Sequence, residues 1–324
     1  MTTKRLGSTD LELTRIGLGT WAMGGGGWRF AWGPQDDQES TRTIYRALDL
    51  GINWIDTAPV YGLGHAEEVV GKAIRGMSEK PIIATKCSRV WNEQGEISSN
   101  LKRDSVRREL ENSLRRLQRE AIDLYQLHWP MPEEDIEEGW STVTELLQEG
   151  KIRCVGVSNF NITQLDRIRE IHPVASLQPP YSMIVPDAEK ELLAYCGRNQ
   201  IGVISYSPMY KGLLTGRITK ERVESFPQDD HRRNDPHFCE PELSVNLEFV
   251  DGLHKVAAEE GKSVAQLAVA WTLRRQEVTA AIVGGRRPAQ IEEIARVRDW
   301  NLSEETIARV DHLLLKRGRS VGLI

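Results

Sequence analysis

The sequence predicts a closed (β/α)8 barrel preceded by a β-hairpin. Eight short apolar runs occur along the 324 residues, each of a length typical of a buried parallel strand. Helical patterns lie between most of these runs, and alternating strands and helices form parallel sheets. Eight is also the number of parallel strands that closes a barrel inside a ring of helices. The expected strands are Ile16–Gly19, Ile52–Ile55, Ile82–Thr85, Ile122–Leu127, Ile152–Val157, Val174–Gln178, Val203–Tyr206 and Ala280–Val283.

Turn-forming residues near the start of the chain predict the hairpin. Lys4–Leu6 and Leu11–Leu13 would pair across Gly7–Asp10. Helices are predicted where apolar residues recur on one face between residues that can begin or end a helix. The expected helices are Asp37–Leu50, Ser105–Leu117, Ile136–Gln148, Asp187–Arg198 and one beginning near Ala289, with Leu247–Glu259 and Ser263–Arg274 as extra helices before the eighth strand.

Composition and charge limit the classes of function. The net charge is −5, no basic stripe suggests nucleic acid, and no apolar segment approaches the roughly 18 residues needed to cross a membrane. No signal peptide is evident at the start. The four cysteines lack the paired spacing of zinc or redox motifs. Because no linker interrupts the sequence, we expect one domain over residues 1–324. Scattered single cysteines fit reduced thiols, so we expect the protein in the cytoplasm. We expect no metal, nucleic-acid or membrane partner, and no oligomer is evident.

Four polar residues end or follow predicted strands. Asp56 and Lys86 each close an apolar run. His128 closes Ile122–Leu127, and Tyr61 lies five residues beyond Asp56. Taken singly, Asp56 fits a loop cap, Tyr61 a half-buried aromatic residue and His128 a core histidine, whereas a lysine ending a buried strand is costly unless paired. Because the carboxyl ends of barrel strands open on one face, the four side chains should converge on a pocket suited to proton transfer.

The segment Gly17–Ala22 matches the glycine fingerprint of dinucleotide-binding folds, but no helix can follow it. Met23 and four glycines come next, and four glycines in a helix would cost about 3–4 kcal/mol. We therefore reject a Rossmann domain. The same glycines begin the first of three long loops that follow strands and are expected on the catalytic face. These loops are Gly24–Gly33, Ser88–Asn100 and Phe226–Pro241.

Two glycine-containing segments late in the chain are suited to binding anions. Gly212–Gly216 can present backbone amides to a phosphate. After the eighth strand, Gly284–Pro288 combines a glycine turn, Arg286, Arg287 and the start of a helix. The alternative for the two arginines is a solvated surface pair.

Motifs spread over the whole chain carry a resemblance to a known family. They are Gly17–Trp21, Asp56–Gly62, Ala84–Lys86, Asp123–Pro130, Gly150–Arg153, Gly156–Phe160, Gln178–Tyr181 and Gly284–Glu293. In this order and spacing they resemble the motifs of the aldo-keto reductase superfamily. Gly285–Pro288 and Asp229–Arg232 make the chain most similar to the bacterial general-stress-protein branch of its NADPH-dependent members.

The resemblance implies a TIM barrel that binds NADPH or NADP+ across its mouth. The implied reaction is reduction of aldehydes, and some ketones, to alcohols by direct hydride transfer. The implied catalytic residues are Asp56, Tyr61, Lys86 and His128, with Tyr61 as proton donor. We expect Lys86, held by Asp56, to bring the pKa of Tyr61 toward the working range. A neutral His128 would position the carbonyl.

The family pattern also implies which residues contact the ligands. The substrate would meet Trp21, Tyr61, His128 and Trp129. The nicotinamide end of the cofactor would meet Thr20, Trp21, Asp56, Ser158, Asn159, Gln178 and Tyr206. The pyrophosphate would meet Ser207, Met209, Lys211, Gly212, Leu213, Thr215 and Arg232. The adenosine 2′-phosphate and adenine would meet Gly284, Arg286, Gln290 and Glu293.

Two functions of different class fit this resemblance. The first is a working NADPH-dependent carbonyl reductase with a small-molecule substrate. The second is a cofactor-binding regulatory subunit resembling the β-subunits of potassium channels, although no extra segment precedes the hairpin here. Turnover of a simple aldehyde separates the two. A metal-dependent hydrolase is a third possibility, but the histidines are not clustered as metal ligands require.

Overall fold

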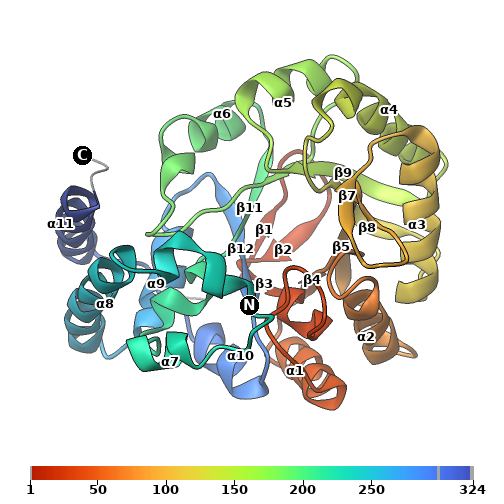
Figure 1. The fold of residues 1–324 in the computed structure, drawn as a ribbon. Helices are drawn as coiled ribbons and strands as arrows, with labels where there is room; N and C mark the ends of the chain where they lie inside the picture. Colours follow the sequence, from red (N-terminus) through yellow and green to blue (C-terminus); the bar gives the residue numbers. More distant parts are fainter. Residues whose placement is uncertain (1, 298–299, 322–324) are drawn as a thin grey trace.

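Eight parallel strands form a closed barrel in which neighbours along the chain are neighbours in space (Figure 1). The structure is a computed structural model that describes residues 2–297 and 300–321. It confirms the predicted (β/α)8 TIM barrel, with all eight strands in the expected places. The strands are β3 (Ile16–Gly19), β4 (Trp54–Asp56), β5 (Ile82–Cys87), β8 (Ile122–Leu127), β9 (Ile152–Ser158), β10 (Ser176–Gln178), β11 (Gly202–Tyr206) and β12 (Val278–Gly284).

Helices surround the barrel and bury their apolar stripes against it (Figure 1). In α3, for example, Val106, Leu110 and Leu117 are fully buried, as the helical spacing predicts. Two of the helices, α2 and α5, were not among those expected from the sequence. The surrounding helices are α1 (Asp37–Asp49), α2 (His65–Ile74), α3 (Arg103–Leu117), α4 (Ile136–Gln148), α5 (Ile162–Arg169), α6 (Leu192–Arg198), α9 (Val264–Leu273) and α10 (Pro288–Ala295).

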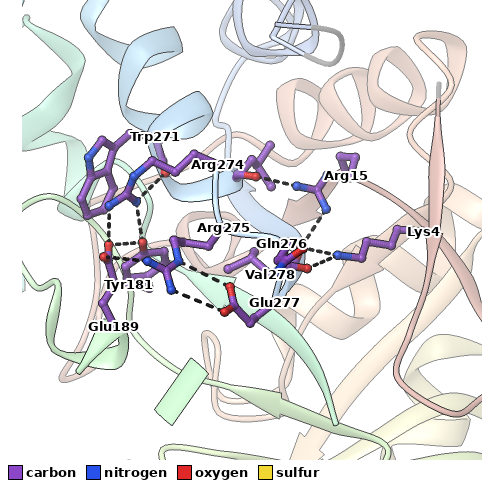
Figure 2. A network of polar contacts seen from close by, with 11 residues as sticks. Lys4, Arg15, Tyr181, Glu189, Trp271, Arg274, Arg275, Gln276, Glu277 and Val278 are labelled. Atoms are coloured by element: carbon purple, nitrogen blue, oxygen red, sulfur yellow. Dashed lines mark hydrogen bonds and ion pairs between the residues drawn. The ribbon is translucent and has the colours of Figure 1, made fainter. Parts of the chain in front are cut away.

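Three segments differ from their predicted form. The expected helix at 187–198 is broken into a short 3-10 turn, Asp187–Glu189, and α6. The turn places the Glu189 carboxylate against Arg274, with 2.7 Å between the carboxylate oxygen and Nη2 (Figure 2). The loop Ser88–Asn100 contains a hairpin of β6 (Arg89–Trp91) and β7 (Ile97–Ser99). The loop Phe226–Pro241 contains two 3-10 turns, His231–Asn234 and Pro236–Phe238.

The segment before the last strand carries additional helices. After α7 (Lys220–Glu224), the helix α8 (Glu242–Glu259) begins earlier than expected, because Leu243 is also buried. It packs against α11 (Glu304–Ser320) at one side of the barrel (Figure 1). The following helix, α9, packs on β12 and belongs to the barrel itself. Among the described helices, none has the length and apolar character needed to cross a membrane.

The predicted N-terminal hairpin closes one end of the barrel. Its strands, β1 (Thr3–Arg5) and β2 (Glu12–Thr14), pair antiparallel. Leu6, Leu11 and Leu13 are buried in one cluster with residues of the barrel strands, including Trp54. The turn requires glycine at position 7, since its φ is +56° and an added Cβ would lie 2.6 Å from the carbonyl oxygen of Gln200.

Cationic side chains bind the hairpin region to the turn before β12 (Figure 2). Arg15 donates from Nη1 to the carbonyl of Val278 at 2.7 Å and from Nη2 to that of Leu273 at 2.6 Å. Lys4 Nζ donates to the Val278 carbonyl at 3.3 Å and also contacts that of Gln276. The Leu273 carbonyl is in the last turn of α9, where carbonyls have no partner within the helix, and Arg15 supplies one. Lys4 and Arg15 therefore connect the hairpin region to the segment between α9 and β12.

Candidate active site

A cavity of about 1520 Å³ opens at the carboxyl ends of the strands. Its wall includes the last residue of six barrel strands: Gly19, Asp56, Ser158, Gln178, Tyr206 and Gly284. This is the face on which barrel enzymes build their active sites. All four polar residues predicted from the strand ends lie at this face, close together.

Lys86 connects two of the predicted catalytic residues. Its Nζ donates to Asp56 Oδ1 at 2.7 Å and to the Thr57 carbonyl at 2.9 Å, and it lies 3.4 Å from the Tyr61 hydroxyl. Lys86 is fully buried and Asp56 is 2% exposed. Burial lowers the pKa of Lys86, while the Asp56 charge opposes that shift. The pair compensates two buried charges that would be costly alone.

His128 lies beside the phenol of Tyr61. The two rings meet edge to face with 5.9 Å between their centroids. Burial, followed by the charges of Lys86 and Arg89, holds the pKa of His128 well below its ordinary value. The imidazole is therefore neutral at physiological pH, as expected. Its Nδ1 is buried and has no hydrogen-bond partner within the described part of the chain.

The pKa of Tyr61 moves in the direction opposite to the one predicted. Burial, and after it the Asp56 charge, raise this pKa well above the ordinary value of a phenol. The expectation of a pKa close to the working range is therefore wrong, because desolvation disfavours the phenolate. The phenol keeps its proton at neutral pH.

Residues predicted to hold the nicotinamide form hydrogen bonds with one another and with the predicted catalytic residues. Tyr206 donates to Asn159 Oδ1 at 2.9 Å, and Asn159 Nδ2 donates to the His128 carbonyl at 3.0 Å. Ser158 Oγ donates to the Gln178 carbonyl at 2.8 Å. The Thr20 hydroxyl donates to the carbonyl of Asp56 at 3.1 Å. These contacts join residues at the ends of six strands and orient the polar groups that face the cavity.

The segment after β11 turns its backbone sharply along the cavity. Ser207, Lys211 and Gly212 have φ values of 56°, 53° and 91°, and all three line the cavity with Met209 and Thr215. Lys211 is paired with Asp235, with 2.6 Å between Nζ and Oδ2. Leu213 differs from the others, because its side chain is fully buried in the core.

Arg232 lines the cavity, but its charge is already compensated. It donates from Nε and Nη2 to the two oxygens of Asp230, at 2.9 and 2.6 Å. Its guanidinium lies 3.9 Å from the centroid of the Phe226 ring. A third donor, Nη1, reaches the Lys211 carbonyl at 3.3 Å. Arg232 therefore fixes the segment after β11 in place.

Arg286, at the far end of the cavity, has only neutral partners among the described residues. It donates from Nε to Gln35 Oε1 at 2.6 Å and from Nη1 to the Trp32 carbonyl at 3.2 Å, and it also contacts the carbonyl of Pro34. No carboxylate of the described chain pairs with it. An arginine without a counter-ion beside a cavity is suited to a phosphate.

The other residues predicted for this end have protein partners. Gln290 Oε1 accepts from the backbone amides of Arg286 and Arg287, at 2.8 and 3.1 Å, so it caps α10. Glu293 is paired with Arg217, with 2.6 Å between oxygen and Nη2. Several lining residues were not among the contacts predicted from the sequence. These residues are Gln35, Gln38, Glu39 and Arg42 before and within α1, and Arg29, Arg89 and His231 in the three long loops.

Aromatic side chains form the outer wall beside Tyr61. Trp21 stacks on Tyr61 with 6.2 Å between centroids and on His231 with 4.9 Å. Trp129, at the rim, is 37% exposed. Trp21 and Trp129, the two tryptophans predicted to meet the substrate, both line the cavity.

The cavity is cationic although the chain is acidic overall. Nine Lys and Arg residues line it against five Asp and Glu residues, in a chain of net charge −5. Such a wall attracts anionic ligands. Over residues 2–297 and 300–321, no group of three or more His, Cys, Asp or Glu side chains is placed to hold a metal ion.

Comparison with known proteins identifies the family. Residues 15–315 match the sequence model of the Aldo/keto reductase family. The chain is 42% identical over 312 residues to aldo-keto reductase YhdN of Bacillus subtilis, covering 95% of this chain and 92% of that protein. It is 34% identical over 313 residues to the NADH-specific methylglyoxal reductase of Escherichia coli, covering 92% and 94%.

A solved structure shows the same fold and a similar sequence. The glycerol dehydrogenase AKR11B4 from Gluconobacter oxydans superposes with a TM-score of 0.88 at 41% identity, covering 98% of this chain and 96% of that one. The barrel, the residues at its strand ends and these relatives all indicate the same family. The chain belongs to the aldo/keto reductase family of oxidoreductases.

Proposed function

We propose that the protein reduces aldehydes, and some ketones, to alcohols with NADPH, and that Tyr61 donates the proton. The observation that carries this proposal is the position of Lys86 Nζ, 2.7 Å from Asp56 and 3.4 Å from the Tyr61 hydroxyl at the floor of the cavity. This arrangement offers a buried acid next to a cation. Named relatives that reduce methylglyoxal or oxidise glycerol support carbonyl–alcohol chemistry.

Tyr61 and His128 would act on the carbonyl oxygen together. When bound, the reduced nicotinamide would supply the hydride. A neutral His128 protonated on Nε2 would leave a lone pair at the buried Nδ1 and donate to the carbonyl oxygen. The Tyr61 phenol, kept protonated by its raised pKa, would transfer its proton to the alkoxide, which is a far stronger base. Lys86 would stabilise the phenolate that remains.

The polar groups around the cavity fit a nicotinamide dinucleotide phosphate. Asn159, Ser158 and Gln178 offer amide and hydroxyl groups beside the catalytic residues, and Tyr206 offers a ring for stacking. The turned backbone from Ser207 to Thr215 can hold a pyrophosphate. The cationic lining as a whole suits a ligand with several phosphates.

Arg286 favours NADPH over NADH. Its guanidinium has no carboxylate partner among the described residues and would meet the 2′-phosphate, which NADH lacks. The NADH-specific relative shows that cofactor choice differs within the family, so the choice must be measured for this chain. The cytoplasmic location and the single domain stay predictions from the sequence.

The test is an assay of nucleotide oxidation with a panel of aldehydes and ketones, run in parallel with NADPH and NADH. We expect turnover with NADPH that saturates at lower nucleotide concentration than with NADH. Nucleotide binding without turnover of any carbonyl compound would instead favour a regulatory, cofactor-binding role. Faster turnover with NADH at equal concentrations would overturn the cofactor assignment alone.

A further inference from the structure

A second cationic region of the cavity lies away from the segments proposed to hold the cofactor. It is formed by Arg89, the first residue of β6, and Arg29, in the loop that follows β3. Trp28 of that loop packs in one hydrophobic cluster with Ile97 of β7. The loop and the hairpin therefore pack on one cluster, and Tyr61 packs against the same cluster.

The guanidinium of Arg89 has free hydrogen-bond donors. Its Nη1 donates to Ser99 Oγ at 2.8 Å, and its Cζ lies 6.0 Å from the centroid of the Trp129 ring. Within residues 2–297 and 300–321, Nε and Nη2 have no hydrogen-bond partner, and neither Arg89 nor Arg29 is paired with a carboxylate. Arg89 is only half-buried and lines the cavity. A ligand that displaced water from these donors without offering them hydrogen-bond acceptors would leave a buried charge unpaired, which is costly.

Arg89 is close to the reacting centre. The preceding residue, Ser88, accepts a hydrogen bond on Oγ from the backbone amide of Trp129 at 3.3 Å. Trp129 in turn follows His128 directly. The charge of Arg89 is among the causes that hold the pKa of His128 down. A short substrate with its carbonyl at His128 could therefore reach Arg89 with its other end.

We propose that the preferred substrate is a short aldehyde or ketone that carries an anionic group, a carboxylate or a phosphate, which Arg89 binds. Arg29, at the rim, adds attraction over a longer distance. The inference rests on the proposed carbonyl reduction and names its substrate class. Arginine suits the task because its planar fork can donate two parallel hydrogen bonds to either group.

Arg89 also packs on Trp129, so the test must separate binding of an anion from support of the hairpin. Arg89→Met keeps an apolar stem on Trp129 and removes the charge. Arg89→Lys keeps the charge and removes the fork. Arg115→Met is the matched control, because Arg115 lies on α3 outside the cavity and bonds only to Asn112 among the described side chains.

The measurement compares kcat/KM for substrates matched in length but not in charge, with NADPH saturating. Succinate semialdehyde is paired with butanal to test a carboxylate, and glyceraldehyde phosphate with glyceraldehyde to test a phosphate. We expect the wild type to prefer one or both charged substrates. A hydrogen bond to a charged group predicts that Arg89→Met lowers this preference at least about tenfold, mainly through KM. The preference of Arg89→Lys for charged substrates should lie between those of the wild type and Arg89→Met. The preference of Arg115→Met should match that of the wild type.

The outcomes separate this inference from the proposed reaction. If Arg89→Met loses activity equally on charged and neutral substrates, Arg89 only supports the hairpin and the inference is wrong. It is also wrong if the wild type reduces butanal and glyceraldehyde at least as well as their charged partners. If the wild type reduces no carbonyl compound with either nucleotide, the proposed reaction itself fails, and the substrate class falls with it.

Discussion

The side-chain amide of Gln178 donates to Oδ2 of Asp56 at 2.8 Å, although 122 positions separate the two residues in sequence. Lys86 occupies Oδ1 of the same carboxylate. Both oxygens of this buried acid are therefore paired, one by a lysine and one by a residue expected from the sequence only to contact cofactor. Gln178 links the proposed nicotinamide site to the charged pair beneath it.

Replacing Gln178 should destabilise the protein even without cofactor. Gln178→Leu leaves a buried carboxylate oxygen unpaired, and the free energy of unfolding should fall by about 1–3 kcal/mol. Urea unfolding of the cofactor-free protein measures this, with Gln148→Leu at the exposed end of α4 as control. Equal stability of the two variants would show that water replaces the amide at Asp56.

Removing the phenolic hydroxyl should abolish most of the reaction and spare binding. Tyr61→Phe is expected to lower kcat at least about 100-fold, the low end of general-acid contributions, while nucleotide affinity changes little. Because burial raises the pKa of Tyr61, the wild-type rate should not fall between roughly pH 6 and 8 through loss of that proton. A pH–rate profile and a fluorescence titration check both statements. Near-normal turnover by Tyr61→Phe would assign the proton to another donor.

Arg286 should distinguish the two nucleotides. Loss of a hydrogen bond to a charged group costs about 1.5–3 kcal/mol, so Arg286→Ala should weaken NADPH binding roughly 10- to 150-fold and leave NADH nearly unaffected. Titration of both nucleotides with tryptophan fluorescence is the measurement.

Arg286 also holds the segment from Trp32 to Gln35, so a control is needed. Gln35→Ala breaks one of these contacts and keeps the charge. It should affect both nucleotides alike and only slightly. If Arg286→Ala weakens NADH by the same factor as NADPH, the arginine acts through the loop and not on the phosphate.

Glu109 should make stability depend on pH. This carboxyl is 7% exposed on α3, accepts from Ser105 Oγ at 3.2 Å, and has a pKa raised by burial to about 8. Because the folded-state pKa lies above that of the unfolded chain, the folded state holds the proton longer. Stability is therefore lost as the pH rises from about 4.5 to about 8.

Replacing the acid by its amide should remove this loss. The free energy of unfolding of Glu109→Gln minus that of the wild type should be larger at pH 8 than at pH 5, by roughly 3–5 kcal/mol. Denaturant unfolding at both pH values tests this, with the exposed Glu111→Gln of the same helix as control. A pH-independent difference between Glu109→Gln and the wild type would place the titration elsewhere.

Features set by local sequence were predictable here. The apolar runs located all eight barrel strands, and the leucines around Gly7 located the hairpin, because burial of strands and tight turns leave local patterns. The hairpin at Ser88–Asn100 was missed, since its strands have three residues each and are only partly buried. The break at Glu189 was missed because the partner of this residue, Arg274, lies far away in sequence.

In the site too, local sequence located some features and could not reveal others. Asp56, Tyr61, Lys86 and His128 were found because each ends or follows a strand. The direction of the Tyr61 pKa was wrong because burial depends on every segment around the pocket. The pairing of Arg232 with Asp230, the capping by Gln290 and the free donors of Arg89 all depend on distances that no spacing in the sequence reveals.

The hairpin that fills one end of the barrel has a kinetic consequence. With Leu6 and Leu11 seated among the strands, nucleotide and carbonyl compound share the opposite opening. Whichever ligand lies deeper must arrive first and depart last. Steady-state rates should therefore give intersecting double-reciprocal lines, and product inhibition should show which of the two products leaves last.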